Sequence, residues 1–296
     1  MNIVIADNSS TVLKLLREQL TLLGHNVDVF QDGAEARDHI YRHADVEILI
    51  TSLELRGVSG FELIWSVRAN AERPYPVYII AMSSNGDEKS LEQVLDSGAD
   101  DFFSKSPNRI EFSARVRSAA RTIALQRKLI FGANHDAMTS LLNRRAFLSK
   151  ANALVLQEDQ FPLAVVMFDV DHFKSINDRC GHAVGDLVLL SIADCMKRED
   201  RAAGRLGGEE FAFLLPDTDA DSAFRMADRF RQRVAETAIT ADSLQIRCTC
   251  SFGVSCVDVG EKTIDEALKR ADQALYQSKR SGRNLVSVCG SAFAAA

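Results

Sequence analysis

The sequence lacks long apolar runs and lacks an excess of basic residues. None of its apolar runs approaches the ~20 residues that cross a bilayer. The first residues, Met1–Asp7, lack the basic start, apolar stretch and cleavage site of a secretory signal. The formal net charge of the 296 residues is −6, which argues against a nucleic-acid-binding surface. These absences predict a cytoplasmic protein that binds neither a membrane nor a nucleic acid.

Closely paired cysteines are also absent. The chain contains six cysteines, and no two of them have the C-x-x-C spacing of a zinc site or a redox motif. All lie in the second half of the chain: Cys180, Cys195, Cys248, Cys250, Cys256 and Cys289. We expect reduced thiols that serve as small core residues.

The first 120 residues alternate short β-like runs with amphipathic helical patterns, which is typical of a parallel sheet wrapped by helices. The expected strands are Asn2–Ala6, Asn26–Phe30, Glu47–Thr51, Val77–Met82 and Asp101–Phe103. This order predicts a flavodoxin-like doubly wound domain over residues 1–120, in which a site lies at the carboxyl ends of the strands.

One long helix is expected over about Arg109–Asn134, with residues 121–134 as a helical linker between two domains. Four apolar residues in this helix have near-heptad spacing: Val116, Ala119, Ile123 and Ile130. They could form a seam with another helix or pack against their own domain. The sequence leaves both interpretations open.

The second half has a different order of elements. A helix (Arg144–Leu156) precedes a strongly apolar strand (Leu163–Phe168), and two more helices are followed by a hairpin that turns at Gly207 and Gly208. After another helix, we expect a strand pair around Gln245–Ser255, a last helix and a short strand. The order predicts an α+β domain over 135–290 with a mostly antiparallel sheet, followed by a flexible tail at 291–296.

Acidic residues follow the apolar strand and occupy the hairpin. Asp169 and Asp171 come at the end of the strand, and Glu209 and Glu210 follow the two glycines. Carboxylates from two adjacent strand ends make a hard-oxygen site that suits Mg²⁺, which binds through one or two carboxylates together with substrate phosphates. Gly with acids is also ordinary turn composition, so this pattern alone is weak.

Six motifs in this half resemble, in order, those of the GGDEF family of diguanylate cyclases. They are Asp136–Arg145 (D-x-L-T-x-L-x-N-R-R), Phe168–Asp178 (F-D-I-D-x-F-K-x-x-N-D), Gly181–Asp186 (G-H-x-x-G-D), Arg205–Phe211 (R-Y-G-G-[DE]-E-F, with Leu206 in place of Tyr), Ser251–Ser255 and Ala274–Asn284. The resemblance implies a nucleotidyl-cyclase-like palm fold and the condensation of two GTP molecules into cyclic di-GMP.

The resemblance also implies roles for individual residues. Asp169, the Val170 carbonyl, Glu209 and Glu210 would bind Mg²⁺ or Mn²⁺, and Glu209 would assist deprotonation of the attacking hydroxyl. The expected triphosphate contacts are Lys174, Lys279 and Arg283, and the expected guanine readers are Asn177 and Asp186. Further substrate-site positions are Phe173, His182, Gly207 and Gly208, although His182 could instead only hold its loop.

Because each domain of this family holds one GTP, the resemblance implies a homodimer, formed here through the first domain and the linker helix. The family's inhibitory R-x-x-D motif aligns with Arg198–Arg201, where Arg201 replaces the Asp, so feedback inhibition by the product is expected to be weak or absent. The alternative function is a catalytically silent module that binds GTP or cyclic di-GMP and acts through partners.

The first domain resembles response-regulator receiver domains, with Lys105, Ser83 and Phe102 at the family's lysine and switch positions. Ser52 occupies the position of the phosphorylated Asp, and the usual acidic pair is Asp7-Asn8. A serine hydroxyl is a poor phosphoryl acceptor without an activating base. We therefore expect a degenerate receiver that dimerises or binds a partner, rather than a two-component output domain switched by phosphate.

Overall fold

The computed structural model describes residues 1–70, 73–83, 88–105, 108–241, 244–258 and 260–289. The chain divides into two compact units, Met1–Ile130 and Phe131–Ala296. The expected tail at 291–296 lies outside the described residues. No helix in the described ranges combines the length and the apolar character needed to span a membrane.

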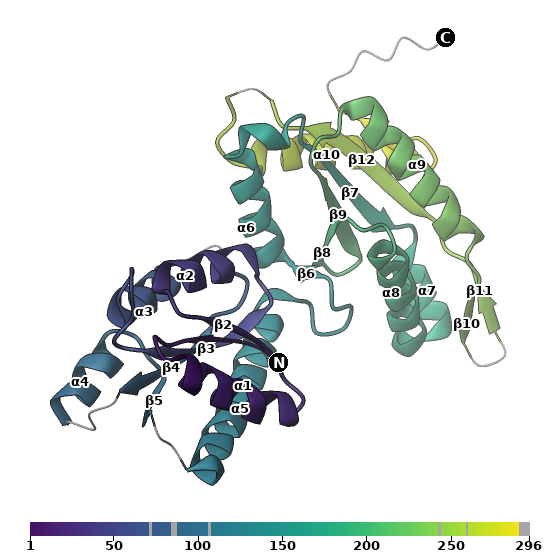
Figure 1. Ribbon diagram of the computed structural model, residues 1–296. Helices are drawn as coiled ribbons and strands as arrows, with labels where there is room; N and C mark the ends of the chain where they lie inside the picture. Colours follow the sequence, from purple (N-terminus) through teal and green to yellow (C-terminus); the bar gives the residue numbers. More distant parts are fainter. Residues whose placement is uncertain (71–72, 84–87, 106–107, 242–243, 259, 290–296) are drawn as a thin grey trace. The chain divides into compact units, whose positions relative to one another are not determined.

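The first unit is a parallel sheet between two layers of helices (Figure 1). Its strands are β1 (Asn2–Ala6), β2 (Asn26–Phe30), β3 (Val46–Ser52), β4 (Tyr78–Ser83) and β5 (Asp101–Ser104), in the order β2-β1-β3-β4-β5. Its helices are α1 (Ser10–Leu22), α2 (Gly33–Arg42), α3 (Gly60–Ala69), α4 (Glu88–Asp96) and α5 (Arg109–Asn134). The flavodoxin-like prediction is confirmed, because all neighbouring strands run parallel.

Capping residues in the sequence mark where helices of this unit begin. Ser9 caps α1, Asp32 caps α2, and Ser59 forms a reciprocal capping box with Glu62 at α3. Gly60 is required where α3 begins, because a Cβ there would lie 2.1 Å from the carbonyl oxygen of Ser52. The start of α3 is thereby packed directly against the carboxyl end of β3.

The long helix α5 packs its near-heptad residues into its own domain. Val116, Ala119 and Ile123 are buried in one core cluster with Phe112 and the inner residues of the sheet. The intradomain interpretation of the near-heptad pattern therefore holds for these three residues. The large apolar side chains that α5 exposes are different ones, Leu125 and Leu129 among them.

The second unit contains a six-stranded sheet in the order β13-β12-β7-β9-β8-β6. Its strands are β6 (Leu142–Asn143), β7 (Ala164–Val170), β8 (Ala202–Gly207), β9 (Glu210–Leu215), β12 (Cys250–Cys256) and β13 (Val286–Val288). Its helices are α6 (Arg144–Val155), the short 3-10 helix η1 (Glu158–Gln160), α7 (Phe173–Cys180), α8 (His182–Lys197), α9 (Ala220–Glu236) and α10 (Asp265–Arg280). The sheet is mostly antiparallel, as the sequence predicts.

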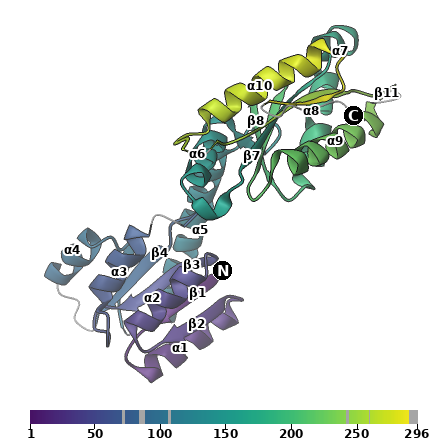
Figure 2. The ribbon, with the colours of Figure 1, turned by 90° about the horizontal axis from the view of Figure 1, so that it is seen from above.

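One expected strand pair divides differently. The sequence predicts a strand pair around Gln245–Ser255, but β11 (Leu244–Ile246) pairs with β10 (Ile239–Ala241), and β12 pairs with β7. Two apolar layers flank the main sheet: α6 and α10 cover one face, and α8 and α9 cover the other (Figure 2). The central strand β7 is buried along its whole length, from Ala164 to Val170.

Candidate active site

The strand end and the hairpin bring acidic side chains together. β7 lies between β9 and β12, and Phe168 stacks on Phe211 and Phe252 of these neighbours. In this register Asp169 lies directly opposite Glu210. The apolar sequence of β7 thus fixes the Asp169 carboxylate, only 10% exposed, beside the acids of the hairpin.

The glycines shape the hairpin between β8 and β9. The pairing register shifts between Arg205 and Gly207, and Gly208 adopts a φ of 48°. A left-handed conformation is inexpensive only for glycine. The turn therefore leaves Glu209 partly exposed at its tip, with Glu210 following in β9.

Sequence reasoning assigned no role to Arg205, although the arginine of the motif was a signal. Its Nε and Nη2 donate to the carbonyl oxygen of Gly208 at 2.9 and 2.8 Å, and its Nη1 donates to Asp136 Oδ1 at 3.1 Å. The same oxygen of Asp136 accepts hydrogen bonds from the backbone N–H and the hydroxyl of Thr139. Burial opposes these bonds, but together they lower the pKa of Asp136. Arg205 therefore ties the hairpin to the start of the domain.

Negative charge exceeds positive charge at the carboxyl end of β7. Lys279 Nζ lies 2.9 Å from Asp169 Oδ2. Even so, burial, followed by repulsion from Glu209 and Glu210, raises the pKa of Asp169 to about 6 against the opposing effect of Lys279. One ammonium group does not offset three neighbouring carboxylates, so the site favours an additional cation.

A hard divalent ion fits this donor set. In the described residues no group of three acidic, His or Cys side chains is arranged as a complete metal site. Magnesium does not require one, because it usually binds through one or two carboxylates plus substrate phosphates. Asp169, the Val170 carbonyl and Glu209 are oxygen donors of the right kind, whereas Asp171 turns to other partners and does not join them.

Cationic side chains lie at the carboxyl end of α10. Lys279 lies in its last turn, and Arg283 follows in a turn where its φ is 64°. A cavity of ≈ 810 Å³ along this helix is lined by Glu210, Tyr276 and Lys279, among others. Lys174, in α7, is exposed. These lysines and the arginine are available to anionic groups of a ligand.

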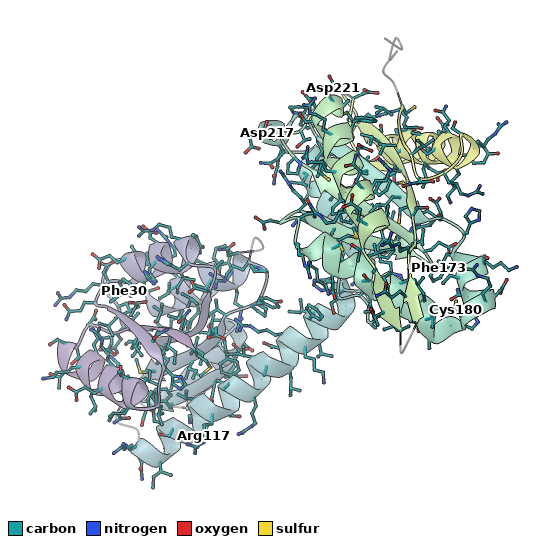
Figure 3. All side chains as sticks on the ribbon, turned by 90° about the vertical axis from the view of Figure 1, so that its right-hand side faces the viewer. Phe30, Arg117, Phe173, Cys180, Asp217 and Asp221 are labelled. Carbon is teal, nitrogen blue, oxygen red and sulfur yellow. The ribbon has the colours of Figure 1, made fainter. Side chains whose placement is uncertain are left out.

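A second group of polar side chains comes from α7 and α8, and the labelled Phe173 and Cys180 mark the two ends of α7 in Figure 3. Asn177 Oδ1 is buried and has no hydrogen-bond partner among the described residues. Gly185 makes room for it, since a Cβ there would lie 1.9 Å from this oxygen. His182, the first residue of α8, and Asp186, one turn further along, are exposed. An unsatisfied amide oxygen beside an exposed carboxylate can accept N–H groups of a ligand.

The residues aligned with the family's inhibitory motif, Arg198–Arg201, follow the end of α8. Arg198 and Arg201 are both exposed, and Glu199 between them forms an ion pair with Arg233 of α9. Arg201 lines a cavity of ≈ 460 Å³ together with Lys150, Lys197 and Asp200. Position 201, where the resemblance predicts a carboxylate, carries the guanidinium of Arg201.

Most polar groups of the first domain's pocket pair with one another. Asp7 is fully buried and pairs with Lys105 Nζ at 3.1 Å. The Ser52 hydroxyl accepts a hydrogen bond from the N–H of Glu54 and donates one to the Glu54 carbonyl oxygen. The side-chain amide of Asn8 donates to the same carbonyl oxygen and accepts from the N–H of Arg56. The backbone N–H of Lys105 donates to the carbonyl oxygen of Ser83. The side chain of Phe102, which lies three residues earlier in the sequence, is partly buried. Lys105 therefore supplies the positive charge that balances Asp7.

Both units of the chain resemble known protein families. Residues 133–285 match the family described as diguanylate cyclase, GGDEF domain, and residues 3–117 match the response regulator receiver domain. The response regulator PleD of Caulobacter vibrioides is 31% identical over 255 residues, which cover 81% of this chain and 56% of PleD. The diguanylate cyclase DgcM of Escherichia coli is 40% identical over 171 residues, or 55% of this chain and 40% of DgcM. The chain thus spans about half the length of the curated relatives it matches, or less.

A solved structure shares the fold of the second half. The coiled coil and GGDEF domain of DgcB from Caulobacter crescentus, in complex with c-di-GMP, is 28% identical with a TM-score of 0.56. The match covers 61% of this chain and 98% of that one. The protein belongs to the GGDEF family of diguanylate cyclase domains, joined here to a receiver domain.

Proposed function

We propose that the protein is an active diguanylate cyclase that condenses two GTP molecules into cyclic di-GMP and two pyrophosphates. The observation that carries this proposal is the pairing of Asp169 with Glu210 across β7 and β9, with Lys279 at the same strand end. Degenerate domains that only bind nucleotide would have no need for this acidic pair. Because the substrate would be the GTP of the cytoplasm, we place the reaction there.

The residues of the strand end have complementary tasks. Lys174, Lys279 and Arg283 offset the charge of the triphosphate, and Glu209 accepts the proton of the attacking 3′-hydroxyl. The 3′-oxygen of one GTP forms a bond to the α-phosphorus of the other, and pyrophosphate leaves. A bound Mg²⁺ or Mn²⁺, held by Asp169, Val170 and the hairpin glutamates, would stabilise negative charge on the phosphate oxygens.

The acceptor groups of Asn177 in α7 and Asp186 in α8 support a preference for guanine. A carboxylate at Asp186 can accept the ring N–H and the exocyclic amino group together, and adenine does not present this donor pair on that edge. Asn177 Oδ1 lacks a partner among the described residues and offers a further acceptor. Leaving such groups unpaired costs about 1–3 kcal/mol, which disfavours ATP.

Two copies are needed, since each domain would present one GTP to the other. Twofold symmetry suits a product that is itself twofold symmetric. Leu125 and Leu129 are 63% and 73% exposed and lie four residues apart on α5, so they share one helix face. We propose that this face of α5, with the face made by α4, β5 and α5, pairs with a second copy.

We further propose that the receiver controls this pairing without phosphorylation. Ser52 replaces the acceptor, and Lys105 already balances the buried carboxylate of Asp7. Incubation with acetyl phosphate and Mg²⁺ should leave the mass of the protein and its turnover unchanged. A phosphoryl adduct on the receiver that alters turnover would instead make the domain an ordinary phosphate switch.

The test of the main proposal is turnover as a function of protein concentration. Purified protein with GTP and Mg²⁺ should form cyclic di-GMP with a specific activity that rises with concentration. Glu209→Ala should abolish the product, whereas Glu236→Ala, which removes the same charge from an exposed position on α9, should not. Nucleotide binding without any product, even at high protein concentration, would assign the chain to the silent binding modules.

A further inference from the structure

Asp171 differs from the other acids of the site because its carboxylate is buried and hydrogen-bonded to groups of its own domain. It is 5% exposed and accepts hydrogen bonds from Thr249 Oγ1 at 2.7 Å, Ser251 Oγ at 2.6 Å and the backbone N–H of Asn284 at 3.0 Å. Its own N–H donates to the carbonyl of Thr249. The hydrogen bonds of Asp171 thus link the end of β7 to segments that are distant in the sequence.

The turn that contains Asn284 has an unusual backbone. Gly282, Arg283 and Asn284 all have positive φ values, of 120°, 64° and 48°. Two consecutive non-glycine residues in this region are strained and persist only where the surroundings hold them. Here the Asn284 N–H is bound by Asp171, and the Asn284 side chain accepts from Arg231 Nη1 of α9 at 3.0 Å.

Two aspartates of the same strand end therefore bind the end of α10 in different ways. Asp169 pairs with the side chain of Lys279, and Asp171 binds the backbone one residue after Arg283. The direction in which Arg283 leaves the turn is set by the dihedral angles that this hydrogen bond supports. Arg283 is itself exposed, and no side-chain hydrogen bond or ion pair is assigned to it in the described structure.

We infer that Asp171 is a positioning residue that directs Arg283 toward the triphosphate of the bound nucleotide. The inference rests on the proposed function. It gives the second acid of the strand-end motif a task separate from that of Asp169: Asp171 shapes the anion-binding turn and does not contact the substrate. A purely structural Asp171 would instead stabilise the domain without acting through Arg283.

A double-mutant cycle separates these two roles. Asp171→Ala removes the acceptor of the Asn284 N–H, whereas Asp171→Asn retains it, because an amide oxygen can occupy the Oδ2 position while the amide nitrogen donates to Ser251. Binding is measured with the unreactive α,β-methylene analogue of GTP in Mg²⁺ buffer, and turnover is measured with GTP. Ser251→Ala is the matched control, since it removes one partner of Asp171 and leaves the bond to Asn284 intact.

Asp171→Ala should weaken analogue binding about tenfold, the loss expected for one charge-assisted hydrogen bond, and should raise KM more than it lowers kcat. Asp171→Asn and Ser251→Ala should stay within about threefold of the wild type. In an Arg283→Ala background, Asp171→Ala should have no further effect on binding. Additive losses would show that Asp171 does not act through Arg283, and unchanged analogue binding in Asp171→Ala would equally overturn the inference.

Hydrogen exchange gives a test that does not depend on a variant folding. The amide of Asn284 should be protected in the wild-type protein, and exchange at the rate of an exposed amide would overturn the inference. Failure of the proposed function has a different signature. In that case the wild type itself would form no cyclic di-GMP, whatever the behaviour of the Asp171 variants.

Discussion

Lys279 Nζ lies 2.9 Å from Asp169 Oδ2, which joins the last turn of α10 to the end of β7 across more than a hundred residues of chain. The pair brings a cation to a buried carboxylate of the candidate site. Because Glu209 and Glu210 also act on Asp169, the pair leaves net negative charge at the strand end. Burial of Asp169, together with this residual charge, raises its pKa.

Asp169 should make the stability of the metal-free protein depend on pH. Its pKa of about 6 in the folded protein exceeds the value of about 3.9 for an unfolded chain, so the folded state binds the proton more tightly. The resulting stabilisation is complete below about pH 4 and is lost as the pH rises through 6. Relative to Asp169→Asn, the wild type should lose about 2–3 kcal/mol of unfolding free energy between pH 4 and pH 7. Denaturant unfolding of both proteins in chelator-treated buffer measures this difference, and a pH-independent difference would contradict the prediction.

Arg205→Ala should impair turnover more than stability. The substitution removes both hydrogen bonds to the Gly208 carbonyl and the bond to Asp136, so the hairpin that carries Glu209 loses its tie to the start of the domain. We expect turnover to fall at least about tenfold and the unfolding free energy to fall by about 1–3 kcal/mol. Arg225→Ala, which removes an arginine that bonds only locally to Ser222, is the control. Equal turnover in the two variants would show that Arg205 does not position the hairpin.

Gly185→Ala should weaken recognition of the base. The new Cβ would lie 1.9 Å from Asn177 Oδ1 and 3.2 Å from Cζ of Phe173, so the Asn177 amide must move. We expect KM for GTP to rise about tenfold or more, and the preference for GTP over ATP to fall. Ala183→Ser, an exposed change in the same turn of α8, should leave both quantities near the wild-type values. The prediction fails if Gly185→Ala retains wild-type selectivity.

Leu129→Glu should uncouple the two copies. A charge in an apolar helix pair is costly, so the variant should remain monomeric at concentrations where the wild type dimerises. Turnover should then drop about tenfold or more, while single-site binding of nucleotide is retained. Ala124→Glu introduces the same charge at another exposed position of α5 and is the control. Sedimentation and turnover, measured on the same samples, decide whether this face of α5 makes the contact.

Lys105→Met should destabilise the receiver domain. The substitution leaves the fully buried Asp7 carboxylate without its counter-ion, which costs about 3–5 kcal/mol when a buried pair is broken from one side. Adding Asp7→Asn should recover most of the lost unfolding free energy, because a neutral amide needs no counter-ion. Thermal unfolding of the two variants measures both effects, and a double variant no more stable than Lys105→Met would contradict the account.

Much of the architecture could be predicted from local pattern. The alternation of β-like runs and amphipathic helices indicated the order of the first domain, and the expected Asn2–Ala6 and Asn26–Phe30 coincide with β1 and β2. The segment 245–255 was misassigned because a strand's partner is not encoded in its own sequence. β11 pairs with its neighbour β10, whereas β12 pairs with β7, roughly eighty residues earlier.

By itself, the sequence determined the family and located the acids of the strand end and the hairpin, because residue types in order carry that information. The replacement of the receiver's acceptor by Ser52 stays a prediction from the sequence. Only the tertiary structure showed that Asp169 and Asp171 have different partners. Although both belong to one short motif, one pairs with Lys279 beside the hairpin acids and the other binds Thr249, Ser251 and Asn284. The physical reason is that hydrogen-bond partners depend on which strands and turns the folded sheet places beside β7, and those segments lie 78 to 113 residues from Asp171 in the chain.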